Sequence, residues 1–203
     1  MDMLGTKILE ERKSKYTGDV KVVRSLGFGT YLQVGGITQS GGVVEEIWKK
    51  TLRFVNRKSY IVNRCLILGL GGGTVARLIK EYWPEAKITG VEIDPVMIEL
   101  GTKYLGLKRN EIEIEIGDAY NFDSKGFGLV VVDVYCGDKF PKKFENEKFL
   151  KKLTKNKLVI FNRLYFGEKR KEAVRFGNKL EKIFSKIEWF YPQANLMFLC
   201  YNK

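Results

Sequence analysis

The residues best placed for chemistry are a run of glycines and the acidic residue that follows them. Residues 68–74 read LGLGGGT, between the apolar run CLIL and the helix-like VARLIKEYW. Glycines in a strand-to-helix turn let the backbone approach a ligand, and the start of the helix points free N–H groups at it. Glu92 ends the next predicted strand, 21 residues after Gly71. A carboxylate at this spacing can accept hydrogen bonds from both ribose hydroxyls, so the pattern indicates a nucleotide-type ligand.

The glycine spacing fits two cofactors. Gly71, Gly73 and Ala76 match the G-x-G-x-x-A pattern of NAD-binding turns. Gly69, Gly71 and Gly73 match the G-x-G-x-G turn typical of enzymes that use S-adenosylmethionine (SAM). A tight turn that holds no ligand is a third interpretation, and the turn alone does not decide among them.

The composition limits the chemistry that such a site can perform. The 203 residues include no histidine, which excludes Ser-His-Asp and Cys-His mechanisms, and we expect no metal. Cys65, Cys136 and Cys200 lie far apart in a chain without a secretion signal, so disulfides are not expected. A general base must therefore be a carboxylate, a tyrosine, a lysine or a cysteine.

The elements that position these residues alternate between strand and helix patterns. Strands are expected at 65–70, 86–93, 111–119, 127–134, 156–164, 186–192 and 195–202, and helices at 74–83, 95–106, 145–153 and 168–184. This alternation predicts an α/β fold with a doubly wound, mostly parallel sheet and an antiparallel last strand. Ligands of such sheets bind beyond the carboxyl ends of the strands.

A separate pattern precedes the glycine turn. The segments DVKVVRSL and GTYLQVGG alternate apolar and polar residues and predict a β-hairpin, and VVEEIWKKTLRFV has helical spacing. We therefore divide the chain into an N-terminal hairpin and helix at 1–60, packed on a nucleotide-binding domain at 61–203.

Longer stretches of the chain resemble the spermidine synthase family and its SAM-methyltransferase-like relatives. The resemblance runs from about residue 20 to residue 165. It rests on YLQVGGITQSGG, on the stretch from CLILGLGGGT to VEIDP, on GDA at 117–119, and on Asp133 at the end of the strand LVVV. It favours SAM or decarboxylated SAM over NAD.

The resemblance also assigns binding roles. Glu92 would bind the ribose, Ile93 would line the adenine, and Asp118 and Ala119 would meet the adenine amine and ring. Gln39 would reach the sulfonium end from the N-terminal segment. A turn or helix-cap aspartate is the structural alternative for Asp118.

The chain departs from the family at its acidic positions. Spermidine synthases carry GGGDGG in the turn, and Gly72 stands here at that acid. They also carry a pair of aspartates after the fourth strand, as in DSSDP, where this chain reads DVYCGDKFP. Asp133 is kept, Cys136 occupies the second position, and Asp138 would substitute only if the loop shifted. These losses favour methyl transfer over aminopropyl transfer.

We expect Asp133 to be catalytic, either deprotonating an amine or hydroxyl acceptor or holding an ammonium near the sulfur. Tyr135 is a second catalytic candidate, with packing on the loop as its alternative. Trp48 is expected in the core. The leading hypothesis is a SAM-type transferase acting on a small-molecule acceptor. A polyamine aminopropyltransferase and an inactive partner protein are alternatives.

The charge distribution leaves a nucleic-acid-binding role open. The net charge is +12, and residues 139–186 contain 16 Lys/Arg against 5 Asp/Glu. Such a block is typical of nucleic-acid surfaces but also of solvated helix faces. No apolar run has the length of a membrane span and no leader is recognised, so we expect a cytoplasmic protein without membrane partners. A homodimer remains open.

Overall fold

The first of two sheets is formed by the N-terminal segment. The computed structural model describes residues 5–202. This antiparallel sheet has the order β1-β2-β3-β4 and consists of β1 (Thr6–Ser14), β2 (Gly18–Ser25), β3 (Gly29–Val34) and β4 (Ile37–Gly41). The predicted hairpin corresponds to β2 and β3, and the outer strands were not predicted. β1 lacks a regular apolar alternation, and β4 is short and ends in glycine.

The second sheet has seven strands in the order β10-β11-β9-β8-β5-β6-β7. They are β5 (Arg64–Leu68), β6 (Lys87–Glu92), β7 (Glu113–Ile116), β8 (Leu129–Val132), β9 (Leu158–Leu164), β10 (Lys186–Phe190) and β11 (Asn195–Tyr201). The ladders among β5 to β9 are parallel, and β11 runs antiparallel to both of its neighbours. The predicted fold class and antiparallel last strand are confirmed.

Helices cover both faces of the large sheet. They are α1 (Gly42–Asn56), α2 (Thr74–Tyr82), α3 (Pro95–Tyr104), α4 (Glu147–Leu153) and α5 (Lys169–Leu180), with 3-10 turns at Arg109–Glu111 and Lys142–Glu145. Alternate residues of β5 point to opposite faces of the sheet. Ile67 packs with α1 and α2 on one face, and Leu66 and Leu68 pack with α4 and α5 on the other. Within residues 5–202, no helix combines the length and apolar character that a membrane span requires.

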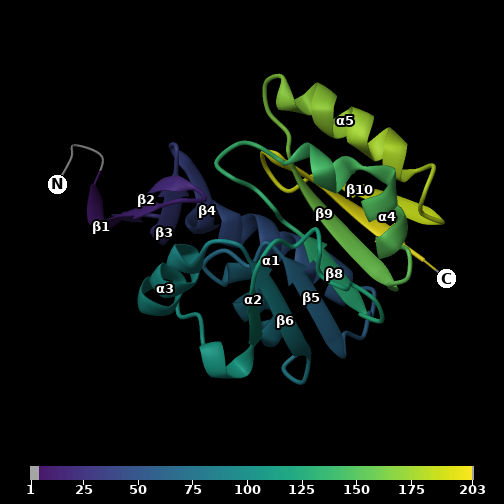
Figure 1. Ribbon diagram of the computed structural model, residues 1–203, viewed down its shortest axis with the longest axis horizontal. Helices are drawn as coiled ribbons and strands as arrows, with labels where there is room; N and C mark the ends of the chain where they lie inside the picture. The colour runs from purple at the N-terminus through teal and green to yellow at the C-terminus, as the bar shows by residue number, and fades with distance from the viewer. Residues whose placement is uncertain (1–4, 203) are drawn as a thin grey trace.

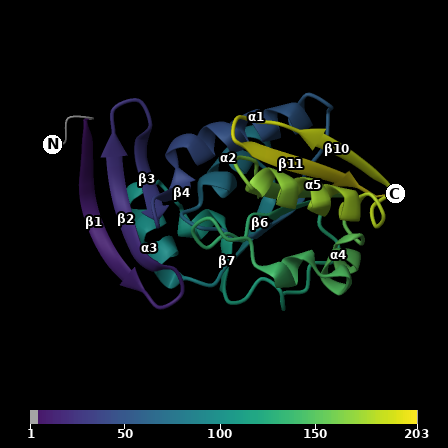
Figure 2. The same ribbon diagram turned by 90° about the horizontal axis from the view of Figure 1, so that it is seen from above.

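The N-terminal sheet lies at one end of the molecule, and β10, β11 and α5 lie at the other (Figures 1 and 2). The N-terminal sheet packs on α3 through a small apolar core that joins Val22 and Leu32 to Met97 and Leu100. The chain then passes directly from β4 into α1 and the main core. This path brings β4 beside the carboxyl ends of the parallel strands, where the sequence predicts a ligand.

Candidate functional site

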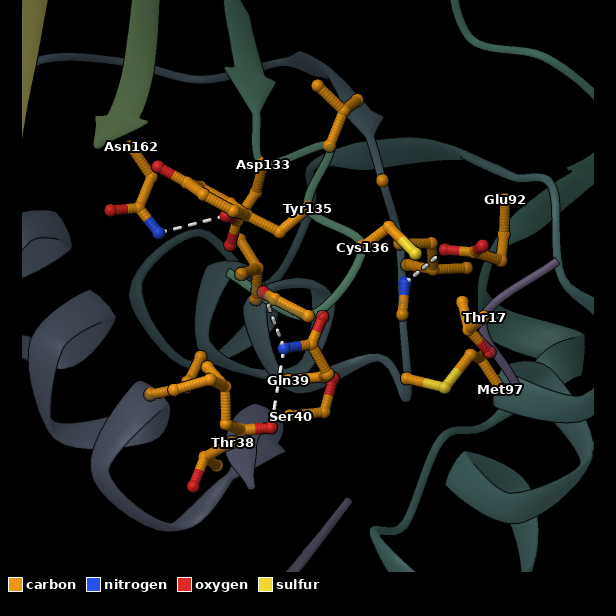
Figure 3. A pocket seen from close by; sticks show the side chains of 18 of the residues that line it. Thr17, Thr38, Gln39, Ser40, Glu92, Met97, Asp133, Tyr135, Cys136 and Asn162 are labelled. Atoms are coloured by element: carbon orange, nitrogen blue, oxygen red, sulfur yellow. Dashed lines mark hydrogen bonds between the residues drawn. The ribbon is translucent and has the colours of Figure 1, made fainter. Parts of the chain in front are cut away.

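A cavity of about 490 Å³ lies between β4 and the carboxyl ends of β5, β6, β8 and β9. This volume is typical of a small-molecule site. Its lining includes nine of the ten residues predicted for the site: Gln39, Gly69, Gly71, Glu92, Ile93, Asp118, Ala119, Asp133 and Tyr135. Figure 3 shows Glu92 and Asp133 on opposite sides of the cavity, with Gln39 below them on the Asp133 side.

The glycine turn forms the floor of this cavity. Gly69 and Gly71 have positive φ angles, and a Cβ at Gly69 would lie 2.3 Å from the backbone oxygen of Asp133. Glycine is therefore required where the turn meets the end of β8. Gly73 also has a positive φ, but it lies against Leu107 and does not line the cavity. Its place is the N-cap of α2.

Glu92 is held by backbone donors at the end of β6. Its Oε2 accepts from the Gly71 N–H at 2.7 Å, and its Oε1 accepts from the Asp94 N–H at 2.9 Å. Burial raises the pKa of Glu92, and these backbone donors act in the opposite direction. Each carboxylate oxygen has a second lone pair, so the side chain can still accept from a ligand in the cavity.

Asp118 serves a turn and an ion pair. Its Oδ1 accepts from the Tyr120 N–H at 3.0 Å, and its Oδ2 pairs with the Lys143 ammonium, which also lines the cavity. Burial raises the pKa of Asp118, but Lys143 and the Tyr120 N–H outweigh it, and the net pKa is lowered. A ligand amine at this place would compete with Lys143.

Gln39 joins the N-terminal sheet to the loop after β8. Its side-chain N–H₂ donates to the backbone oxygens of Ile37 at 3.3 Å and Gly137 at 3.1 Å (Figure 3). Its neighbour Ser40 accepts from the Gly72 N–H at 2.8 Å. β4 is thus bound both to the glycine turn and to the loop that carries Asp133.

Asp133 accepts a hydrogen bond on each carboxylate oxygen. The Trp48 indole N–H donates to Oδ2 at 2.8 Å. The Asn162 side chain donates to Oδ1 at 2.8 Å (Figure 3). Asn195 in turn donates to the Asn162 oxygen at 2.6 Å, which fixes the orientation of that amide. Burial raises the pKa of Asp133 to about 6, and the Asn162 and Trp48 donors moderate the increase. Asp133 is therefore a positioned carboxylate whose pKa is raised.

This network includes residues that sequence reasoning did not select. Trp48 is fully buried in the core, as predicted, but its N–H also positions Asp133. Asn162 and Asn195 are buried polar residues in the mostly apolar strands LVIFNRL and NLMFLCY. A buried amide needs a hydrogen-bond partner. The two asparagines could therefore have been selected from the sequence as residues that contact another polar group.

The Trp48 contact predicts a measurable change in the titration of Asp133. Carbon-13 NMR of the Asp133 carboxyl should give a pKa of about 6 in the native protein. Trp48→Phe removes a donor that favours the charged form, so it should raise that pKa to about 7 or above. An unchanged pKa in a folded variant would refute the positioning role.

The same titration has a consequence for folding. Because the pKa of Asp133 is higher in the folded chain than in the unfolded chain, its contribution to the free energy of unfolding should fall as pH rises between about 4 and 6.

Tyr135 and the loop that follows it contact β9, the N-terminal sheet region and the start of α5. The Tyr135 hydroxyl accepts from the Leu164 N–H at 2.8 Å, its ring packs edge-on against Phe140, and burial raises its pKa. The Cys136 thiol lies at the cavity, 3.7 Å from the Tyr16 carbonyl oxygen. Asp138 does not line the cavity, because it pairs with Lys169 at 3.1 Å.

Sequence comparison places the chain near two kinds of enzyme. No protein-family model matches it. It is 26% identical over 132 residues to the mouse eEF1A lysine and N-terminal methyltransferase, covering 56% of this chain and 19% of that protein. It is 29% identical over 94 residues to the polyamine aminopropyltransferase of Vibrio vulnificus, covering 43% of this chain and 31% of that protein. The chain thus matches less than a third of the length of either relative.

Solved structures share the fold over 79–96% of this chain. A probable spermidine synthase from Corynebacterium glutamicum has a TM-score of 0.77 at 16% identity, covering 96% of this chain and 80% of that chain. A spermidine synthase in complex with the transition-state analogue AdoDATO has a TM-score of 0.76 at 17% identity, with coverages of 96% and 73%. Human methyltransferase-like protein 13 in complex with SAH has a TM-score of 0.64 at 20% identity, with coverages of 79% and 82%. The chain has the SAM-methyltransferase-like fold.

Proposed function

We propose that this chain binds SAM in the cavity and transfers its methyl group to an amine or hydroxyl acceptor. The observation that carries the proposal is the arrangement of acids around the glycine turn. In the sheet order, Glu92 ends the strand on one side of β5, and Asp133 follows the strand on the other. The similarity to proteins named as methyltransferases and aminopropyltransferases supports a transferase of this type.

The Glu92 end of the cavity suits an adenosine. Glu92 has free lone pairs for two ribose hydroxyls, and the neighbouring Ile93 and Ala119 supply apolar surface for a purine. Asp118 can accept a hydrogen bond from the exocyclic amine of adenine when its ion pair with Lys143 opens. Gln39 lines the cavity from β4, next to the loop that carries Asp133, and is proposed to face the sulfonium.

The Asp133 end supplies the base. A bound sulfonium provides a methyl carbon that is open to in-line displacement. The lone pair of the acceptor forms the new bond to that carbon, the carbon–sulfur bond breaks, and its electron pair stays on sulfur, giving a neutral thioether. Asp133 takes the proton released from the acceptor, held for this by Trp48 and Asn162. Positioning of the two reactants contributes much of the rate in such a reaction.

Methyl transfer is favoured over aminopropyl transfer by the surroundings of Gly72. A Cβ at this position would lie 2.8 Å from Leu105, 2.9 Å from Leu32 and 3.1 Å from Ser40. Gly72 does not line the cavity. The space that an acidic side chain occupies in spermidine synthases is taken up here by the neighbouring side chains. An aminopropyltransferase that uses decarboxylated SAM is the alternative.

This packing predicts the outcome of restoring the family's acid. Gly72→Ala should lower the free energy of unfolding by about 1–3 kcal/mol, because the added methyl overpacks the core. Gly72→Asp should be less stable still and should gain no preference for decarboxylated SAM. Chemical denaturation and calorimetric titration check both expectations. A stable Gly72→Asp variant that binds decarboxylated SAM more tightly would contradict this account.

Parallel calorimetric titrations with SAM, decarboxylated SAM and NAD test the proposed function. We expect SAM to bind more tightly than decarboxylated SAM, and NAD not to bind. Preference for decarboxylated SAM would favour the aminopropyltransferase alternative. Binding of neither sulfonium nor of their thioether products would refute a SAM-type transferase.

A further inference from the structure

The cavity divides into two ends on either side of β5. β6 and β7 lie on one side, where Glu92 ends β6 and Asp118 follows β7. β8, β9 and β11 lie on the other, where Asp133 follows β8 and the two strands β9 and β11 contain Asn162 and Asn195. We call the second part the acceptor end, because the proposed function places the acceptor there. It also includes the cavity-lining residues of α1 and of the segments beside β9 and β11.

Apart from Asp133 and its amide partners, much of the wall of the acceptor end is apolar. α1, which carries Trp48, also contributes Val43, Val44 and Ile47 to the cavity lining. The segments next to Asn162 and Asn195 contribute Leu164, Phe166 and Ala194. These side chains offer contact to an aliphatic or aromatic body and no partner for a charge.

Asp133 is the single carboxylate at this end, within residues 5–202. The other two acids of the cavity lining, Glu92 and Asp118, lie across β5. The acids of the neighbouring segments lie outside the lining. Glu45 pairs with Arg77, Asp138 with Lys169, Glu145 with Arg163 and Glu168 with Lys171, and Glu46 is exposed on α1. One ammonium therefore finds a partner at the acceptor end, and a second does not.

Exposed aromatic rings continue the apolar wall outward. Phe166 lines the cavity and is 39% exposed, and Tyr191 is 53% exposed. Tyr191 packs edge-on against Tyr165 with ring centroids 5.5 Å apart. The Tyr165 N–H binds the carbonyl oxygen of the cavity-lining Ala194 at 2.7 Å. The rim beside the acceptor end is thus aromatic.

Resting on the proposed function, we propose that the acceptor is a monoamine with an aliphatic or aromatic body. Its nitrogen faces Asp133, and its body lies along the α1 wall toward the Phe166 rim. An amine suits Asp133 better than a hydroxyl does, because its ammonium form pairs with the carboxylate by charge. Transfer of one ammonium proton to Asp133 then frees the nitrogen lone pair that attacks the methyl carbon. A polyamine would place a further ammonium against the apolar wall, and each missing charge-assisted hydrogen bond lowers affinity about 10–150-fold.

The test compares hexylamine with 1,6-diaminohexane, which share a chain length and differ by one ammonium. Each amine is titrated by calorimetry into the complex of the protein with S-adenosylhomocysteine. Each is also incubated with SAM, and methylated product is measured by mass spectrometry. We expect hexylamine to bind at least about 10-fold more tightly than the diamine and to be the better methyl acceptor.

Two variants of Phe166 at the rim, one charged and one neutral, provide the matched control. Phe166→Glu should improve binding of the diamine relative to hexylamine, and Phe166→Gln, of the same shape but neutral, should not. Equal or tighter binding of the diamine by the unaltered protein would overturn the inference, as would failure of both amines to bind. In either case, bound S-adenosylhomocysteine would leave the proposed function standing. Failure to bind S-adenosylhomocysteine or SAM would refute the proposed function itself.

Discussion

Replacing Asp133 with asparagine is expected to lower kcat for methyl transfer about 10²–10⁴-fold, the usual contribution of a general base. Asparagine keeps the shape of the side chain but cannot take up the proton of the acceptor. Its amide N–H₂ would also face either the Trp48 or the Asn162 donor. The affinity for SAM should change little, because the adenosine contacts lie at the Glu92 end. Steady-state kinetics and calorimetry together separate these effects.

Asp138→Asn is the matched control for this prediction. It makes the same chemical change on the same loop, but Asp138 pairs with Lys169 and does not line the cavity. Its kcat should stay close to that of the unaltered protein. If Asp133→Asn lost no more activity than Asp138→Asn, proton transfer to Asp133 would not contribute to the reaction.

Replacing Glu92 with glutamine is expected to weaken SAM binding by at least about 100-fold. The variant loses two charge-assisted hydrogen bonds to the ribose, each of which contributes about 10–150-fold in affinity. The new amide N–H₂ would also face a backbone donor, from Gly71 or Asp94, and disturb the glycine turn. Calorimetric titration with SAM measures the loss directly, and circular dichroism verifies the fold.

The control for Glu92 is Glu115→Gln on the adjacent strand β7. Glu115 pairs in register with Val91, next to Glu92, but its side chain is exposed and does not line the cavity. This variant should bind SAM as the unaltered protein does. Equal affinities for the two variants would show that Glu92 does not bind the ribose.

The large sheet was predictable because its strands are short apolar runs separated by helical periodicity. β8, with the sequence LVVV, is fully buried, and β5 is buried except for its first residue. β1 was not predictable, since its sequence TKILEERKS is mostly exposed and its structure depends on pairing with β2. Edge strands of this kind obtain their conformation from a neighbour rather than from their own pattern.

The positions of Glu92 and Asp133 were predictable because parallel strands end at one edge of a sheet. Their partners were not. Trp48 meets Asp133 across 85 residues, and Asn162 meets it across 29. Both contacts depend on how α1 and β9 pack against β8, which local pattern does not specify. Ser40 is a similar case, because it reaches the Gly72 N–H from a strand that was not predicted.

The basic stretch 139–186 is less uniform in three dimensions than in sequence. Arg163 is buried between the rings of Phe140 and Phe176 and pairs with Glu145. Lys143 pairs with Asp118 at the cavity. These two cations contribute to packing and to the site rather than to an open surface.

The most direct test of the account is a crystal structure of the protein with S-adenosylhomocysteine bound. We predict both ribose hydroxyls within hydrogen-bond distance of the Glu92 carboxylate, the adenine against Ile93 and Ala119, and the sulfur directed toward Asp133. A ligand bound in the opposite direction, or outside this cavity, would contradict the assignment of the two ends and the role of Asp133.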